Sequence, residues 1–106
     1  MKPNFDVEVT QYDIDNSTPC LEDSCAVANA VERALKQQVP SLRFSKIIVN
    51  EWRTVICTRR TDIIYENSES LIKWINYYDD HELVRPMTVR LENGVARILT
   101  PGEEKS

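Results

Sequence analysis

Glycine, histidine and long apolar runs are scarce in this sequence, and each scarcity argues against a class of protein. The 106-residue chain has two glycines and one histidine, so it lacks the closely spaced glycines of a phosphate-cradling loop and shows no catalytic motif. No apolar run approaches the ~20 residues that span a membrane. The first residues, MKPNFDVEV, lack the apolar core of a secretory signal. We therefore expect a cytoplasmic protein with no membrane partner and no enzymatic activity.

Basic residues are also in deficit. The formal net charge is −4, which argues against a general nucleic-acid binder because such proteins carry a basic excess. The charge is uneven: residues 3–31 contain six acids and no Lys or Arg, whereas residues 43–60 contain five basic residues and one acid. One end of the molecule would suit a basic partner and the other an anionic one, although an uneven solvated surface is the simpler interpretation.

Length and composition predict one domain. With 106 residues, of which 42% are hydrophobic and 28% charged, the chain can bury a core without help from metals or disulfides. We assign residues 1–100 to this domain and residues 101–106 to a disordered tail.

The strongest local pattern runs from Ser24 to Gln38. Its apolar residues recur at the spacing of one helix face; they are Val27, Ala30, Val31, Ala34 and Leu35. Asp23 or Ser24 is the expected N-cap, and Pro40 ends the helix. Before this helix, Asn4–Tyr12 alternates like a half-buried strand, and the polar stretch Asp13–Asp23 is predicted to be a loop.

Further strands and a second helix follow. Lys46–Val49 and Thr54–Cys57 are typical of a hairpin, and Asp62–Tyr65 of a third short strand. A second apolar stripe predicts a helix over Ser68–Tyr78, with Asn67 or Ser68 as its N-cap and Trp74 as its main anchor. With the C-terminal hairpin, the order is β-α-β-β-(β)-α-β-β. It predicts an α+β fold, a two-layer sandwich in which a small antiparallel sheet is packed by two helices.

The C-terminal hairpin is the most specific of these predictions. Asn93-Gly94 favours a two-residue type I′ turn between the strands Met87–Glu92 and Val95–Leu99. The register then pairs Leu91 with Ala96, Val89 with Ile98, and Arg90 with Arg97. One side of the hairpin is therefore apolar. The two arginines on the other side are destabilising unless an acid or an anionic ligand lies nearby.

Two stretches resemble a known family. Residues 9–15, VTQYDID, and 25–35, CAVANAVERAL, are similar to a T-x-x-D-I-D motif followed by C-P-[VI]-A-x-A-[VLI]-x-R-A in small proteins encoded by phages and bacterial genomes. Residues 71–79, LIKWINYYD, and 86–91, PMTVRL, resemble the later part of that pattern, so the likeness covers most of residues 7–91. Ala26 departs from it, since proline is usual there. The resemblance implies an accessory protein of phage or mobile-element origin, with no assigned reaction, cofactor or catalytic residues.

The cysteines leave several hypotheses open. Cys20, Cys25, Cys57 and His81 offer four zinc ligands, but a structural zinc site usually shows two close pairs. Cys20 and Cys25 are spaced for a disulfide, although unpaired thiols suit a reducing compartment. Cys25, near a helix start, would make a nucleophilic pair with His81, but the acids just before it oppose a thiolate. We favour plain apolar roles for Cys25 and Cys57, with no metal or other cofactor.

Two groups of carboxylates have residue types that suit acid–base or cation chemistry. They are Asp13 with Asp15, and Asp79-Asp80 beside His81 and Glu82. Neither has the spacing of a calcium loop, and turn and cap roles are commoner for such residues. We predict those roles.

The basic and aromatic middle of the chain is the candidate contact surface. Guanidinium groups beside aromatic rings hold phosphates and stack on bases, and the same residue types anchor protein interfaces. The candidates are Arg43, Lys46, Trp52, Arg53, Arg59, Arg60, Arg90 and Arg97, with Trp52, Arg53, Arg59 and Arg60 expected at the centre.

Three functions follow from these residues. The leading hypothesis is a small non-catalytic binding protein, a phage-type accessory or inhibitor of a host defence system, that acts by contact with a protein. The first alternative is a protein that sequesters a small anionic ligand such as a nucleotide, at a subunit interface if it forms an oligomer. The second is a nucleic-acid-binding accessory protein, whose affinity would fall steeply with added salt.

Overall fold

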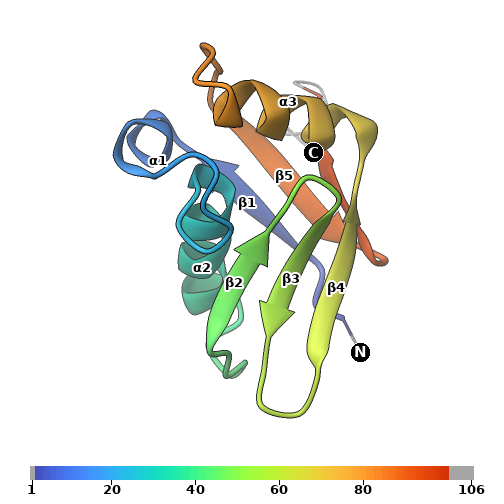
Figure 1. Cartoon of the computed structure of the whole chain (residues 1–106). Helices are drawn as coiled ribbons and strands as arrows, with labels where there is room; N and C mark the ends of the chain where they lie inside the picture. The colour runs from blue at the N-terminus through green and yellow to red at the C-terminus, as the bar shows by residue number, and fades with distance from the viewer. Residues whose placement is uncertain (1, 101–106) are drawn as a thin grey trace.

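The computed structural model describes residues 2–100. In chain order its elements are β1 (Phe5–Val9), α1 (Gln11–Asn16), α2 (Ala26–Gln38), β2 (Lys46–Val49), β3 (Arg53–Cys57), β4 (Asp62–Asn67), α3 (Glu69–Asp79), β5 (Met87–Glu92) and β6 (Val95–Ile98). The predicted α+β class is confirmed, because one six-stranded sheet is packed by helices (Figure 1). None of the helices in this part of the chain is long and apolar enough to cross a membrane. The tail predicted for residues 101–106 lies outside the described residues.

The sheet has the strand order β1-β5-β6-β4-β3-β2. Neighbouring strands are antiparallel except β4 and β6, which run parallel and pair at only two positions, Glu66 with Val95 and Asn67 with Ala96. This short parallel contact is the one departure from the antiparallel sheet that the sequence predicted. It joins two antiparallel halves of three strands each.

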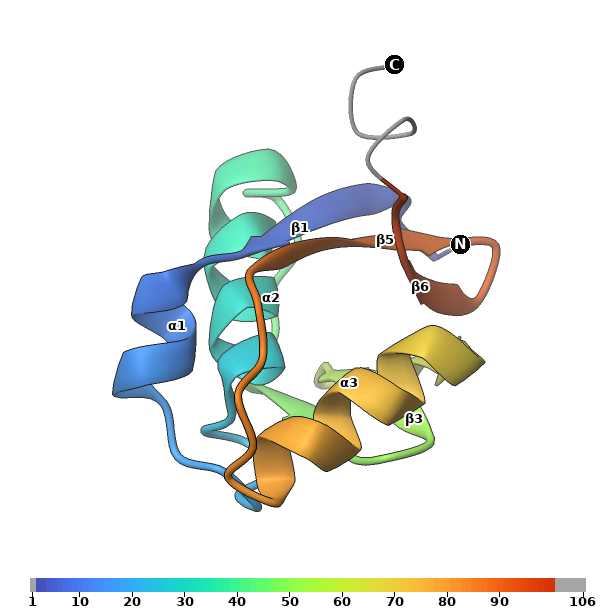
Figure 2. The ribbon, with the colours of Figure 1, turned by 90° about the horizontal axis from the view of Figure 1, so that it is seen from above.

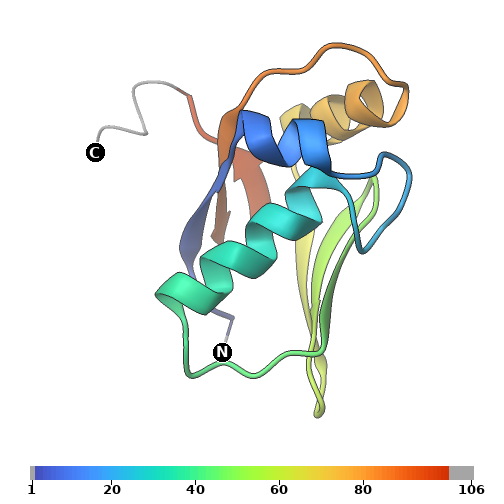
Figure 3. The ribbon, with the colours of Figure 1, turned by 90° about the vertical axis from the view of Figure 1, so that its left-hand side faces the viewer.

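The sheet is curled, and α2 lies across the gap between its two edge strands (Figure 2, Figure 3). The buried face of α2 includes the whole predicted apolar stripe, and the helix packs against both β1 and β2. Its side chains also cover the outer edge of β1, where Arg33 Nη2 donates to the carbonyl of Glu8 (2.9 Å) and Gln38 Nε2 to that of Asp6 (2.7 Å). These bonds occupy backbone groups that would otherwise be free to pair with a strand of another chain.

Both long helices begin with a side-chain cap. The N-cap of α2 is Cys25, whose Sγ accepts a hydrogen bond from the Ala28 amide at 3.5 Å. Asp23 and Ser24, the predicted caps, lie two residues and one residue too early, because Ser24 is still part of a turn closed by its amide and the carbonyl of Leu21. Of the two caps predicted for α3, Asn67 and Ser68, the structure has Ser68, whose Oγ accepts from the Leu71 amide.

The stretch predicted to be a loop begins inside a helix. Helix α1 spans Gln11–Asn16, so β1 ends at Val9 and not near Tyr12. Thr10 caps it reciprocally with Asp13: the Asp13 amide donates to Thr10 Oγ1, and the Thr10 amide donates to Asp13 Oδ2. The capping role predicted for Asp13 is therefore confirmed, although the helix that it caps was missed.

Trp74 is not the main anchor of α3. Its ring is only partly buried and stacks on Tyr78 with ring centroids 5.6 Å apart, while its Nε1 donates to the carbonyl of Arg85. The buried residues of this helix are Leu71, Ile75 and Tyr78. The sequence predicted the right helix face but not how deeply each residue of that face is buried.

The C-terminal hairpin has the predicted register, including Arg90 opposite Arg97. The acid that this pair requires is Asp6 on β1, which lies opposite Arg90 across the sheet. Its carboxylate accepts from Arg90 Nε at 2.8 Å and from Nη2 at 3.2 Å. The like-charge pair is therefore offset within the fold.

Gly94→Ala is expected to lower the free energy of unfolding by about 1–2 kcal/mol. Asn93 and Gly94 have φ values of 52° and 78°, the two positive angles of a type I′ turn. An alanine at 94 would be strained in this conformation, whereas its Cβ would meet only the flexible end of Lys2. Urea unfolding measures the loss; equal stability of the variant and the wild type would show that the turn adopts another form.

Candidate functional site

The predicted contact residues lie on three separate parts of the fold, whose helices and strands are labelled in Figure 1. Trp52 and Arg53 lie at the β2–β3 turn, whereas Arg43, Lys46, Arg59 and Arg60 lie toward the opposite end of these strands, and Arg90 and Arg97 lie on β5 and β6. Arg53 begins β3 and Arg59 follows its end. Six residues of extended chain cover roughly 20 Å, so the expected centre of the contact surface is divided between two ends of one strand.

Trp52 lies in the turn Asn50–Arg53, here called the tryptophan turn, and its side chain is exposed. The residue is 61% exposed. The next residue, Arg53, is also exposed and pairs with Glu66 on β4, Nε to Oε1 at 3.1 Å. Exposed ion pairs of this kind contribute little to stability, so the Arg53 side chain is not needed to hold the fold. The same holds for the Trp52 side chain, because it is exposed.

The backbone of the tryptophan turn is held by two asparagine side chains. Asn50 Oδ1 accepts from the amides of Trp52 (2.9 Å) and Arg53 (2.8 Å). Asn67, at the end of β4, is buried. Its side-chain Nδ2 donates to the carbonyls of Asn50 (2.9 Å) and Glu51 (3.2 Å), and its backbone amide donates to the carbonyl of Trp52. Thr54 Oγ1 completes the set by donating to Asn67 Oδ1. The turn is therefore ordered before any partner binds.

A small pocket adjoins the tryptophan turn, between the α1–α2 loop and α3. Its volume is about 220 Å³, and Leu21, Val49 and Ile75 supply apolar lining. The charged lining residues are all acids, namely Glu22, Glu51 and Asp79. This end of the molecule therefore combines an exposed aromatic ring with an acidic rim.

The opposite end carries a larger pocket, here called the arginine pocket. It lies between the α2–β2 connection and the β3–β4 loop, has a volume of about 560 Å³, and is lined by Arg43, Arg59 and Arg60 together with Leu42 and Ile63. Lys46 begins β2 opposite Cys57 and does not line it. The structure thus brings together three of the predicted cations at a concave surface.

The three cysteines, and Asp79 of the second acidic group, have structural roles in the fold. All three cysteines are free thiols, and within residues 2–100 no three His, Cys, Asp or Glu side chains are grouped to hold a metal ion. Burial raises the pKa of the Cys25 thiol, which disfavours a nucleophilic thiolate. Asp79 Oδ1 accepts from the Cys20 amide at 3.0 Å and ties the α1–α2 loop to the end of α3.

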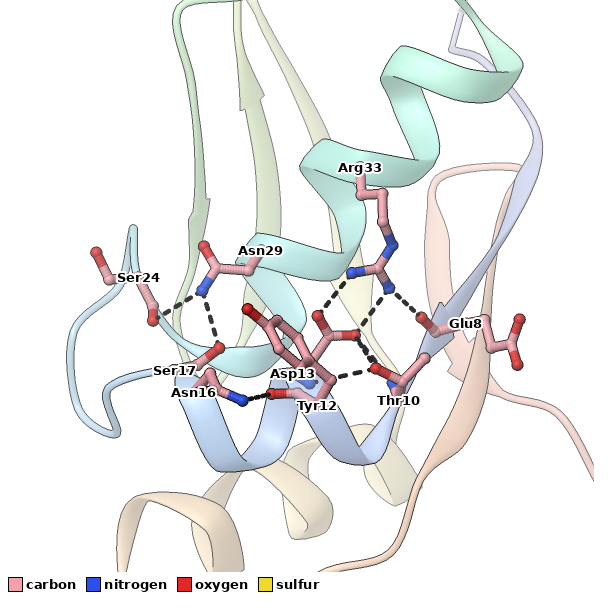
Figure 4. A network of polar contacts seen from close by, with 9 residues as sticks. All are labelled: Glu8, Thr10, Tyr12, Asp13, Asn16, Ser17, Ser24, Asn29 and Arg33. Atoms are coloured by element: carbon pink, nitrogen blue, oxygen red, sulfur yellow. Dashed lines mark hydrogen bonds and ion pairs between the residues drawn. The ribbon is translucent and has the colours of Figure 1, made fainter.

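A polar network between α1 and α2 was not predicted from the sequence (Figure 4). The Asp13 carboxylate, in a residue only 3% exposed, accepts from Arg33 Nη1 at 2.7 Å and from Nη2 at 2.8 Å. Asn29 Nδ2 extends the network to Ser17 Oγ at 2.8 Å. The spacing of Thr10 and Asp13, that of a capping box, was the available signal, but no helix or strand periodicity pairs Asp13 with an arginine 20 positions away, and the family motif that contains both residues does not say that they meet.

Hydrogen bonds explain why the pKa of the buried Asp13 carboxyl is lowered. Burial raises the pKa of this carboxyl, but hydrogen bonds from Arg33 and Thr10 outweigh burial and hold the pKa below its usual range. Asp13 is thus a structural carboxylate, and the predicted contact residues that remain candidates are those of the tryptophan turn and the arginine pocket. Comparison of the chain with family models, curated proteins and solved structures found no match.

Proposed function

We propose that this protein is a non-catalytic binding protein that contacts a partner protein through the tryptophan turn. The observation that carries the proposal is an exposed Trp52 on a turn that the buried Asn67 holds in place. Tryptophan is among the commonest residues that dominate binding energy at interfaces. Because the turn is already ordered, little conformational entropy is lost there on association.

The partner that suits this surface presents basic side chains. The pocket beside the turn is lined by acids and by apolar side chains, which matches the charged end and the apolar stem of a Lys or Arg residue. Its volume of about 220 Å³ is smaller than that of typical small-molecule sites, which have volumes of about 300–1,000 Å³. A single inserted side chain therefore fits it better than a metabolite does.

The biological setting that we propose is a phage-type accessory protein that inhibits a host defence system. Its support is the resemblance of residues 9–15 and 25–35 to small phage and bacterial proteins. The motif residues Thr10, Asp13 and Arg33 hold α1 against α2, so the resemblance concerns the scaffold. Trp52 lies outside those two motifs and would supply the specific contact.

Replacing both Trp52 and Arg53 by alanine is expected to weaken partner binding at least ~30-fold, which corresponds to about 2 kcal/mol. The free energy of unfolding should change by less than about 0.5 kcal/mol, because both side chains are exposed. The partner is first identified by cross-linking and co-purification from the native host. Calorimetric titration of the purified pair then gives the affinity, and urea unfolding gives the stability.

Tyr12→Ala provides the matched control, since Tyr12 is a 72% exposed aromatic residue on α1, away from the turn. It should leave the affinity unchanged. An equal loss in both variants, or unfolding of the Trp52→Ala/Arg53→Ala protein, would show that the tryptophan turn is not a contact surface. A partner that proves to be nucleic acid, with affinity that falls steeply with salt, would contradict the proposal of a protein partner.

A further inference from the structure

The arginine pocket lies at the other end of β3 from the tryptophan turn and has a different chemistry. Its three cations come from two segments: Arg43 follows α2, and Arg59 and Arg60 are the central residues of the β3–β4 loop. Among residues 2–100, none of the three is in an ion pair. The positive charge of this pocket is therefore left uncompensated by the chain.

The β3–β4 loop holds two of these cations side by side. Thr58 and Thr61 close the loop: the Thr58 amide donates to the Thr61 carbonyl, and the Thr61 amide donates to Thr58 Oγ1, both at 3.2 Å. The consecutive residues Arg59 and Arg60 thus line one pocket from a closed loop, where their like charges repel each other. An anion in the pocket would remove this repulsion, and a loop that is already closed loses little entropy when it binds one.

We infer that the arginine pocket binds a small phosphorylated ligand of the nucleotide type, independently of the proposed contact through the tryptophan turn. Guanidinium groups form paired, charge-assisted hydrogen bonds with phosphate oxygens. Leu42 and Ile63 line the same pocket and offer apolar contact to a planar base. The volume of about 560 Å³ falls within the about 300–1,000 Å³ typical of small-molecule sites.

A small ligand fits the charge distribution better than a nucleic-acid strand does. A strand needs a basic track along which successive phosphates lie. Here the cations converge on one pocket, the net charge of the chain is −4, and the pocket at the opposite end of β3 is lined by acids. Acidic surroundings would repel the rest of a long polyanion.

Calorimetric titration of the full chain with ATP, pyrophosphate and adenosine tests the inference. ATP should bind with a measurable Kd, pyrophosphate at least threefold more weakly, and adenosine without saturation. Arg59→Gln/Arg60→Gln should raise the Kd for ATP at least tenfold. Lys36→Gln/Arg85→Gln removes the same charge from exposed residues outside the pocket and should change that Kd less than twofold. ATP should also raise the Tm of the wild type.

Several results would overturn the inference. They are no saturable binding of ATP or pyrophosphate, an unchanged Kd in Arg59→Gln/Arg60→Gln, or an equal loss in the control variant. Pyrophosphate binding as tight as ATP binding would refute the contact with a base. A single-stranded oligonucleotide that binds more than tenfold tighter than ATP would refute a small ligand. Circular dichroism establishes that each variant is folded, and Arg43→Gln replaces the double variant if that protein is not.

Discussion

Arg33→Met is expected to lower the free energy of unfolding by about 2–3 kcal/mol at pH 7. The variant retains the Asp13 carboxylate, in a residue that is 3% exposed in the wild type, but removes its paired guanidinium hydrogen bonds and the bond to the Glu8 carbonyl. Breaking a fully buried ion pair typically costs about 3–5 kcal/mol. We expect less because the Arg33 side chain is 40% exposed, so water screens the pair.

The loss of stability in Arg33→Met should depend on pH, and the pKa of Asp13 determines the direction of this dependence. The pKa of this carboxyl is raised by burial but is held below its usual range, on balance, by hydrogen bonds from Arg33 and Thr10. A carboxyl whose pKa is lower in the folded chain stabilises the fold at pH values above its unfolded pKa of about 4. This stabilisation is lost as the pH falls through the pKa of the folded chain. The stability difference between wild type and variant should therefore be largest at neutral pH and shrink below about pH 4.

Urea unfolding at several pH values measures this difference. Lys36→Met is the control, because Lys36 lies on the same helix and pairs with Glu32 in an exposed i,i+4 ion pair. Such pairs are worth about 0.3–0.5 kcal/mol, so the control should lose little at any pH. A loss for Arg33→Met that matched the control, or that did not change between pH 7 and pH 3, would show that Asp13 does not depend on Arg33.

Asn67→Ala is expected to cost about 2–3 kcal/mol. Asn67 is 8% exposed, and its side chain accepts from Thr54 Oγ1 and donates to the carbonyls of Asn50 and Glu51. Without it, the buried Thr54 hydroxyl loses its acceptor and two carbonyls lose a donor. The tryptophan turn also loses the side chain that ties it to β4.

Two measurements check this prediction. Urea unfolding gives the stability, and amide exchange reports the turn, where the amides of Trp52 and Arg53 should exchange faster in the variant than in the wild type. Asn76→Ala is the matched control, since the exposed Asn76 reaches the same turn through one bond to Glu51 Oε1. Protected turn amides in Asn67→Ala would mean that Asn50 alone orders the turn, and the role given to Asn67 would be wrong.

Helix α1 illustrates why part of the fold was not visible in the sequence. Gln11–Asn16 is too short to show a full apolar period, and isolated helices of this length are unstable in water. Its capping box is local, but the contact that holds it in place comes from Arg33 on α2. A pattern search that looks along the chain detects the cap and not this partner.

The candidate site shows the same limit. Local residue types picked out Trp52 and the arginines as contact residues, but they implied one surface. The structure divides them, because β3 is extended and places Arg53 and Arg59 at opposite ends. Asn67 was predicted only as one of two possible N-caps of α3, since a buried asparagine is recognised as an organiser only when the carbonyls of another strand connection are seen beside it.

What the sequence determined by itself was therefore local. The stripe from Val27 to Leu35 specifies a helix with one buried face, and Asn93-Gly94 specifies the hairpin turn and hence the pairing of Val89 with Ile98. Such patterns record that a face is dry, but not what it packs against. Tertiary structure alone decided that β4 meets β6, that α2 joins the two sheet edges, and that Arg43 meets Arg59 and Arg60 at one pocket. Each of these depends on contacts between residues far apart in the chain, where many pairings satisfy the same local pattern and only packing of the whole core selects one.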